Sequence, residues 1–470
     1  MAPIIGAYAP IKQLIKMALD RLFRLKQRST LANRLISGGA WALGAKIGTL
    51  ILGLMIGGLL ARMLSKSKMG DYIFAQSLVV SAALLAQLGL GPTAVKLIAR
   101  FYAANDLHAV KKSVFHIMRW GVTSAALAAF LFALLGKNLG VSQNIVALTA
   151  IWVIILTIQK LLAEILRGFH DIRAAAIVGG ASLGGLITYI TTAGILLVIW
   201  WQLGAIELNV VFALIVISGI LSLIWGSIHL YKILRSLKPS TIVSNNIRAR
   251  QILWMSFPIL IDSIVLLLLS QSGIWVLRAF RPSPEIAIYG TALRLATLTA
   301  VPLNVINAVT ASTIAELFQK GQTKKLEFIL RGLATLAALP ALIILLIFII
   351  AGANILGLIY GDFYRIGAPV LIILTTGSVM SVAAGSCGQS LMMSGHQKAL
   401  MIVSVISGLL TLTIELLVVQ QYGVIGVAIA MSVGILVKNS LMLVTNKHLT
   451  GIWTLLTFRW KQYIPLITKS

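Results

Sequence analysis

Residues 41–60 read WALGAKIGTLILGLMIGGLL, an apolar stretch rich in glycine that contains one charged residue, Lys46. A helix of this length crosses the apolar core of a bilayer. The short polar link SKSKMGD at residues 65–71 joins it to a second apolar run that ends near Phe101. Two long apolar runs with a short link between them predict a pair of transmembrane helices, and a similar pair follows residue 250.

The composition extends this prediction to the whole chain. Of the 470 residues, 59% are hydrophobic and 11% are charged, and the mean hydropathy is +0.97. A soluble domain cannot bury so large an apolar fraction, so we predict a polytopic membrane protein. Its apolar runs are too long for the strands of an outer-membrane barrel. The predicted fold class is therefore all-α, with about twelve transmembrane helices.

The positive charges behind the net charge of +27 are distributed unevenly along the chain. With twelve spans and a cytoplasmic N-terminus, most of the 39 lysine and arginine residues fall on cytoplasmic tails and loops. This bias predicts that both termini are cytoplasmic, where basic segments face anionic lipid, and it argues against nucleic acid as a partner. The one cysteine, Cys387, excludes an internal disulfide, and the scattered histidines lack metal-site spacing, so we expect no metal and no cofactor.

The predicted organisation has two six-helix lobes. The longest polar break is the basic linker after residue 231, and each flank of it contains six apolar runs. Residues 11–25 place apolar side chains on one helical face and basic ones on the other, which predicts an interfacial helix. The expected divisions are a basic amphipathic cytoplasmic tail at 1–35, an N-terminal lobe at 36–231, a cytoplasmic linker at 232–250, a C-terminal lobe at 251–445 and a cytoplasmic C-terminal tail at 446–470.

The two lobes show a weak internal repeat. Arg62 ends the first apolar run and Arg278 ends the seventh, which gives an offset of 216 residues. The same offset relates Lys46 to Asp262, and both lie about 15 Å into their spans at the helical rise. A charge at that depth costs roughly 2.5 to 3.5 kcal/mol, so both should face a watery cavity or a partner. Two interpretations remain open: Lys46 and Asp262 pair and hold the lobes together, or they belong to a functional site.

Arg294 is the second deep cation. It lies about seven residues into the eighth span. With Lys46 it would form a positive site between the lobes that suits phosphate, because a guanidinium can bind two oxygens at once. The alternative is that Arg294 extends toward the outer membrane surface.

Other charges within spans favour structural roles. Lys160 and Glu164 are four residues apart, with Arg167 three further on, and we predict that Lys160 and Glu164 form a structural pair on one helical face. Glu415 and Lys438 lie nearer span ends, and we expect their side chains to reach the membrane surface.

Three motifs near the N-terminus resemble those of a known family. Residues 61–65 (ARMLS), 69–72 (MGDY) and 86–91 (AQLGLG) look like the start of polysaccharide transporter proteins, the Wzx-type flippases of the MOP superfamily. Twelve spans, two repeats and a basic linker strengthen the resemblance, which covers nearly the whole chain. It implies two six-helix lobes around a central cavity that opens alternately to each side.

The resemblance also implies a function. Such a protein flips undecaprenyl-diphosphate-linked oligosaccharide, a repeat unit of O-antigen, capsule or exopolysaccharide, across the bacterial plasma membrane without acting as an enzyme. Lys46 and Arg294 fit its cationic cavity, and Asp262 fits coupling to H⁺ or Na⁺. Membrane lipid and other polysaccharide-assembly proteins are the partners that it implies.

Two alternatives come from other classes. A multidrug exporter of the same superfamily binds organic cations, which Lys46 would repel. A membrane polysaccharide polymerase or ligase needs catalytic groups outside the membrane, whereas the outer links here are short and have no cluster of His, Asp or Glu.

Overall fold

A computed structural model describes residues 30–457 except 137, 139, 180–181 and 237–248, and it also leaves undescribed some side chains within its helices. This part of the chain is built from helices without a strand. The predicted interfacial helix at residues 11–25 lies outside it. Ten of the described helices are long and apolar enough to cross a membrane. The chain is therefore an all-α, multi-pass membrane protein, as the sequence predicts.

The helices before the 237–248 gap form what we call the N-terminal half. Gly48, Gly53 and Gly57 let neighbouring side chains contact the backbone of α2, which begins this half. The bounds are α2 (Thr30–Met63), α3 (Lys66–Ala86), α4 (Leu90–Ala103), α5 (Leu107–Leu135), α6 (Gln143–Gly168), α7 (Ile172–Val178), α8 (Leu186–Leu203) and α9 (Leu208–Ser236).

The helices after the gap form the C-terminal half. Their bounds are α10 (Ala249–Phe280), α11 (Ser283–Ala296), η2 (Thr297–Ala300), α12 (Val301–Gln319), α13 (Thr323–Tyr360), η3 (Asp362–Gly367), α14 (Ala368–Ala384), α15 (Cys387–Met393) and α16 (Gln397–Thr450). Gly423 has a positive φ of 52° and reverses the direction of α16, so this element holds two antiparallel arms. The ten candidate spans, α10 and the second arm of α16 together make twelve helical passes.

Several passes are broken rather than continuous. Leu88 and Gly89 have positive φ angles between α3 and α4, and the short 3₁₀ segment η2 separates α11 from α12. Any side chain at Gly89 would overlap the carbonyl oxygen of Ser256 in α10. The break in the second pass therefore lets the two halves approach closely.

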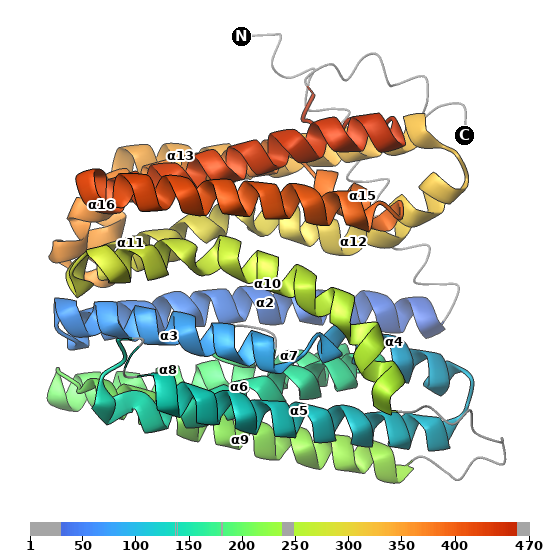
Figure 1. Cartoon of the computed structure of the whole chain (residues 1–470), viewed down its shortest axis with the longest axis horizontal. Coiled ribbons are helices and arrows are strands. Elements are labelled where there is room, and N and C mark those ends of the chain that lie inside the picture. The colour runs from blue at the N-terminus through green and yellow to red at the C-terminus, as the bar shows by residue number, and fades with distance from the viewer. Residues whose placement is uncertain (1–29, 137, 139, 180–181, 237–248, 458–470) are drawn as a thin grey trace.

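The helices of each half gather on one side of the molecule, and α10 crosses between them (Figure 1). α10 and α11 contact α3, α10 also contacts α4, and α13 contacts α2. We call the end that contains Ser65 and Gly423 the Ser65 end, and the end that leads to the 237–248 gap the linker end.

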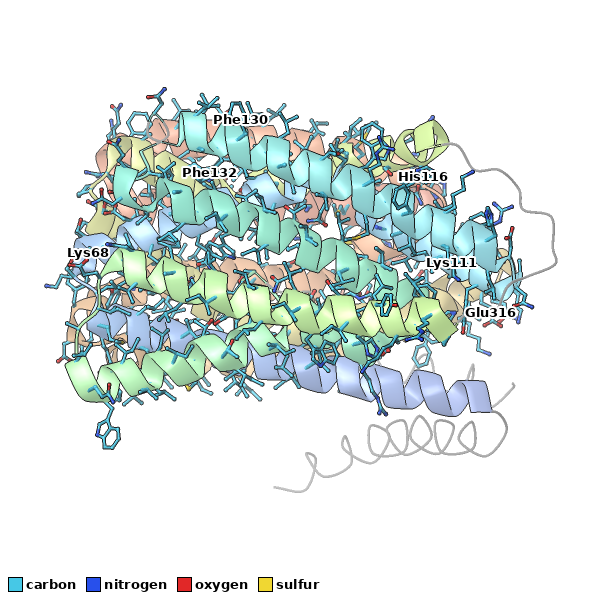
Figure 2. The ribbon with its side chains drawn as sticks, turned by 90° about the horizontal axis from the view of Figure 1, so that it is seen from below. Lys68, Lys111, His116, Phe130, Phe132 and Glu316 are labelled. Atoms are coloured by element: carbon cyan, nitrogen blue, oxygen red, sulfur yellow. The ribbon has the colours of Figure 1, made fainter. Side chains whose placement is uncertain are left out.

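The polarity of the side chains changes along the length of the bundle, as it does across a membrane. Lys68 lies at the Ser65 end, whereas Lys111 and Glu316 lie at the opposite end (Figure 2). Between them the outer surface is apolar: Phe130 is 60% exposed, whereas Phe132 on the same helix is 6% exposed and packs inward. Exposed apolar surface of this extent is stable in a bilayer and unstable in water.

The two halves repeat one contact across their interface. Arg62, at the end of α2, donates to the carbonyl of Leu358, near the end of the third pass of the C-terminal half. Arg278, near the end of α10, donates to the carbonyl of Gly140, just beyond the third pass of the N-terminal half, at 2.8 Å. The offsets between the two donors and between the two acceptors, 216 and 218 residues, are nearly equal. This reciprocal contact is what a pseudo-two-fold axis between the halves produces.

A polar cluster joins the halves at the Ser65 end. Arg278 donates to the Asp71 carboxylate at 2.8 Å and to the Ser283 hydroxyl at 2.6 Å, and Ser283 donates to Asp71 at 2.7 Å. Gly70 packs so closely on the Ser283 backbone that any side chain there would overlap its carbonyl. The interface is therefore closed at this end by charge-assisted bonds and direct backbone packing.

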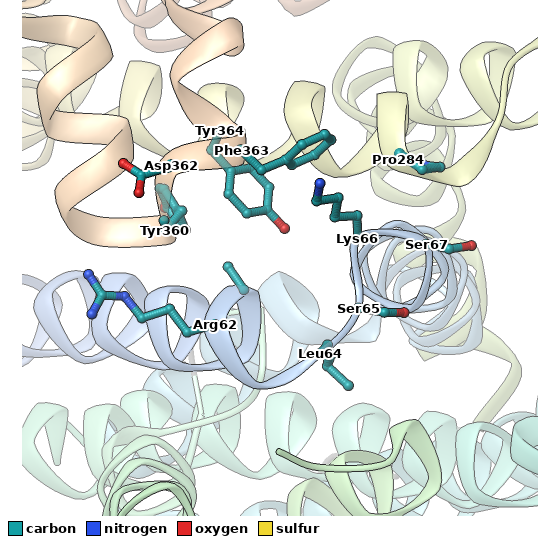
Figure 3. A pocket seen from close by; sticks show the side chains of 12 residues that line it. Arg62, Leu64, Ser65, Lys66, Ser67, Pro284, Tyr360, Asp362, Phe363 and Tyr364 are labelled. Carbon is teal, nitrogen blue, oxygen red and sulfur yellow. The ribbon is translucent and has the colours of Figure 1, made fainter. Parts of the chain in front are cut away.

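A groove lies beside this closure on the surface of the Ser65 end. Lys66 extends over the ring of Phe363 at 4.2 Å, and Arg62 and Tyr360 line the far wall (Figure 3). The groove has a volume of about 690 Å³. Both halves contribute to it, so a separation of the halves at this end would change its shape.

Two predictions about charges near span ends are wrong. Glu415 is fully buried in α16, where its neighbours include Tyr289 and Ser272, instead of reaching the membrane surface. Lys438 lies half-buried in the wall of a polar cavity within the C-terminal half. Position along a span does not determine which face of the helix a side chain occupies, and here both charged residues face protein.

The start of the predicted C-terminal tail is packed against the bundle. α16 continues to Thr450, and the backbone amide of Leu456 then donates to the Ala383 carbonyl at 2.9 Å. Thr335 in α13 donates its hydroxyl to the Thr457 carbonyl at 3.1 Å. Residues 451–457 therefore belong structurally to the C-terminal half.

Candidate functional site

A cavity of about 150 Å³ lies between the halves at mid-length of the bundle. The N-terminal half supplies three of its walls, from α2, α3 and the start of α8, and the C-terminal half supplies the fourth, from the end of α11 and from η2. Its lining residues are Thr49, Leu50, Gly53, Leu54, Gln76, Ser182, Leu183, Tyr189, Arg294, Thr297 and Leu298. Among the described residues of this lining, Arg294 is the one charged side chain.

Arg294 projects from α11 onto the N-terminal half. Its guanidinium donates a short hydrogen bond to the side-chain oxygen of Gln76 on α3. The guanidinium carbon also lies 5.8 Å from the centroid of the Tyr72 ring, within the range of a cation–π contact. The side chain is thus directed between the halves and not toward the outer membrane surface.

Glycine at position 57 makes room for this arrangement. A Cβ added to Gly57 would lie 3.0 Å from Nη1 of Arg294 and 3.4 Å from the Tyr360 ring. Tyr360 is buried, and its hydroxyl interacts electrostatically with the positive charge of Arg294. The glycine-rich face of α2 therefore admits a guanidinium and an aromatic ring where a larger residue would exclude them.

The charge of the site is positive. No carboxylate in the described portion of the chain forms an ion pair with Arg294, whereas Arg167, Arg278, Arg281 and Arg365 each have one. Gln76 supplies an amide oxygen, which satisfies one donor without cancelling the charge. A cation held in this way in a small, partly buried cavity attracts an anion strongly, because the local dielectric constant is low.

Lys46 lies elsewhere on α2. Its side chain is exposed, and its carbonyl accepts a hydrogen bond from Thr49, a residue of the cavity wall, at 2.9 Å. Gly57, the contact of Arg294, is eleven residues further along the helix, or about 16 Å at the helical rise. Lys46 therefore lies nearer the linker end of α2 than Gly57 does, and it does not belong to the described lining of the cavity.

The other predicted residues lie on α10 and α6. Asp262 falls within α10, but its side chain is outside the described residues, so its pairing with Lys46 stays a prediction. Glu164 forms its direct ion pair with Arg167 and not with Lys160, which lies only within electrostatic range of it. All three side chains are on α6, away from the cavity lining.

The sequence contained a signal for the residues that were missed. Gln76 is a lone amide in an otherwise apolar span, and Tyr72 belongs to the MGDY motif of residues 69–72. Both lie on α3 one turn apart, so they share the helical face that meets Arg294. A buried amide in a membrane helix indicates a polar contact, although the sequence does not identify the partner.

The fold matches solved structures of one transporter superfamily. The lipid II flippase MurJ in an inward closed conformation superimposes with a TM-score of 0.68 and 15% identity over 86% of each chain. An inward-facing multidrug resistance MATE family transporter of the MOP superfamily gives a TM-score of 0.64 and 16% identity over 86% of this chain and 94% of the other. The chain therefore shares the arrangement of helices of these two proteins.

The sequence comparisons are more specific. Residues 35–318, more than half of the chain, match the family described as polysaccharide biosynthesis protein, and the chain belongs to this family. A curated relative, the probable low-salt glycan biosynthesis flippase Agl15 of Haloferax volcanii, is 22% identical over 246 residues. That match covers 52% of this chain and 49% of the relative, so the chain spans about half the length of the curated relative that it matches.

Proposed function

We propose that this protein flips an oligosaccharide linked to undecaprenyl diphosphate from the inner to the outer leaflet of a bacterial plasma membrane by alternating access. One observation carries the proposal: Arg294 lies in a cavity between the halves without an ion-pair partner among the described residues. A guanidinium binds diphosphate oxygens in a bidentate manner. Membership of a polysaccharide biosynthesis family supports a glycan as the rest of the substrate.

In this proposal the Ser65 end faces the outside, and both termini are cytoplasmic. The structure then corresponds to a state closed to the outside by Asp71, Arg278 and Ser283. The diphosphate enters from the linker end, passes Lys46 and binds Arg294, while the polyprenyl chain stays in the surrounding lipid. Separation of the halves at the Ser65 end then releases the head group outward.

The same geometry disfavours the two alternative classes. An exporter of organic cations would place its substrate against the charge of Arg294, which costs free energy in a cavity of low dielectric constant. A polymerase or ligase would need a nucleophile or an acid–base pair beside the substrate, and the lining of the cavity combines one arginine with amide, hydroxyl and apolar groups. The proposal therefore has no covalent step.

A vesicle assay tests whether the protein is a flippase or an exporter of cations. The full chain is reconstituted into liposomes that contain fluorescently labelled lipid-linked glycans extracted from the cells that make it, and a membrane-impermeant quencher reports how much label changes leaflet. We expect rapid leaflet exchange with the protein and slow exchange without it. Efflux of a cationic dye from the same vesicles, without movement of the glycolipid, would contradict the proposal and identify an exporter.

Gly57 provides a test that leaves every charge in place. In Gly57→Leu the new side chain would displace the guanidinium of Arg294 from Gln76. Loss of one charge-assisted contact, worth about 1.5 to 3 kcal/mol, predicts a roughly tenfold to hundredfold lower flipping rate. Gly44→Leu on the same helix is the matched control, because a Cβ there meets nothing within 4 Å. Equal activity of the two variants would show that the position of Arg294 is unimportant.

A further inference from the structure

A second cavity, of about 450 Å³, lies inside the C-terminal half between α12, α14, α15 and the two arms of α16. We call it the C-half pocket. Its lining combines apolar side chains with a group of polar ones. The polar side chains are Asn304, Asn307, Ser378, Ser381, Ser386, Gln389, Ser404, Lys438 and Asn439.

Several of these groups have unused hydrogen-bonding capacity. Within the described residues, the side chains of Asn304, Ser381 and Gln389 make no hydrogen bond, and the side-chain oxygen of Asn307 is buried without a partner. Thr454, beside the pocket, shows the bonded alternative: its hydroxyl donates to the Ala384 carbonyl at 2.8 Å. An unmade hydrogen bond at a buried atom such as the Asn307 oxygen is costly, and the amide and hydroxyl groups around it in the cavity suit a polar ligand.

The chemistry of the lining restricts the ligand. Amide and hydroxyl side chains both donate and accept hydrogen bonds, as sugar hydroxyls do. Among the described residues of the lining, Lys438 is the one charged side chain. Its ammonium would repel a bound metal cation. The oxygen atoms of the lining therefore suit a neutral or acidic sugar better than a coupling cation such as Na⁺.

The pocket is continuous along the chain with the cavity that contains Arg294. Thr297 and Leu298 line the cavity between the halves, and Ala300 and Asn304 line the C-half pocket immediately afterwards. Residues 300, 304 and 307 recur at helical spacing on one face. Ten residues separate Arg294 from Asn304, or about 15 Å at the helical rise. The pocket therefore lies on the linker-end side of Arg294, along the same pass, which η2 interrupts.

We propose that the C-half pocket binds the sugar residues next to the diphosphate of the lipid-linked glycan while Arg294 holds the diphosphate. This inference rests on the proposed function and assigns a glycan subsite within it. The cavity between the halves has about a third of the volume of the C-half pocket, so it accommodates the phosphates and leaves the sugar to the larger space. Selection among glycans then depends on the amide and hydroxyl groups of the C-terminal half.

The single cysteine of the chain makes a direct test possible. Cys387 itself lies in the pocket wall, so Cys387→Ser gives a cysteine-free protein, into which Gln389→Cys introduces a reporter within the pocket. Thr297→Cys in the same background reports on the cavity between the halves. The rate of reaction with N-ethylmaleimide is measured for each purified full-length variant, after its elution volume has confirmed a folded protein.

Two probes separate the sugar from its carrier. One is the lipid-linked glycan extract from the cells that make the chain, and the other is undecaprenyl diphosphate without sugar. We expect the extract to slow labelling at Gln389→Cys at least fivefold and the sugar-free lipid to leave it unchanged, whereas both slow labelling at Thr297→Cys. Equal protection of Gln389→Cys by both probes would show that the pocket binds the carrier lipid and would overturn the sugar assignment.

The reporters also distinguish failure of the subsite from failure of the function. Protection at Thr297→Cys without protection at Gln389→Cys would eliminate the sugar pocket and leave the flippase proposal intact. Absence of protection at both positions would contradict the flippase proposal together with the subsite.

Discussion

Arg294→Ala is expected to insert into the membrane at the wild-type level and to flip lipid-linked glycan about one hundred times more slowly. The variant loses the charge-assisted bonds from the guanidinium to the diphosphate, and about 3 kcal/mol of lost binding free energy corresponds to roughly a hundredfold in rate. The same change removes the contact with Gln76 between the halves. Initial rates of leaflet exchange in vesicles, normalised to the reconstituted protein, measure the effect.

Two further variants separate charge from position. Arg294→Lys keeps the charge but cannot bind two oxygens in one plane, so we expect intermediate activity. Arg119→Ala removes an exposed arginine from α5, outside the cavity, and should flip at the wild-type rate. Full activity of Arg294→Ala would remove this residue from the site. A similar loss in Arg119→Ala would attribute the effect to net charge.

A cross-link at the Ser65 end is expected to stop transport completely. The Asp71 carboxylate and the Ser283 hydroxyl lie 2.7 Å apart and come from opposite halves. In the cysteine-free background, Asp71→Cys and Ser283→Cys place two thiols across the interface, and a short bifunctional thiol reagent can join them. Because alternating access requires the halves to separate at this end, the linked protein should be inactive.

Reversal of the cross-link and the single-cysteine proteins provide the controls. A reagent linked through a disulfide allows release by a reducing agent, and we expect activity to return to the level measured before linking. The same reagent applied to Asp71→Cys alone or to Ser283→Cys alone should have little effect. Continued flipping by the fully cross-linked protein would show that the Ser65 end is not a gate.

The fold follows closely from the sequence, because the bilayer imposes a strong rule on length and polarity. Apolar runs of sufficient length identify the passes. The correspondence of Arg62 with Arg278 also follows from the spacing of the repeat. The helix break at η2 directly precedes Pro302, and proline favours kinks, whereas the 3₁₀ conformation of residues 297–300 cannot be read from the sequence.

The site was predicted only in outline. Depth within a span identifies Arg294 as unusual, since a charge there must find a polar environment. Depth does not specify the direction in which a side chain points, so it identifies Lys46 and Arg294 as candidates without showing that Lys46 is exposed and that Arg294 contacts Gln76. The partners Gln76 and Tyr72 come from another helix. Their positions relative to Arg294 depend on packing between the halves, and this packing cannot be predicted from a single sequence.

Binding of the diphosphate of a lipid-linked glycan by Arg294 can be measured directly. The measurement is native mass spectrometry of the purified full-length protein after incubation with lipid-linked glycans from the cells that make it. We expect that the wild-type protein retains the diphosphate lipid in the gas phase, that Arg119→Ala retains it equally, and that Arg294→Ala loses it. Retention of the same lipid to the same extent by Arg294→Ala would contradict the claim.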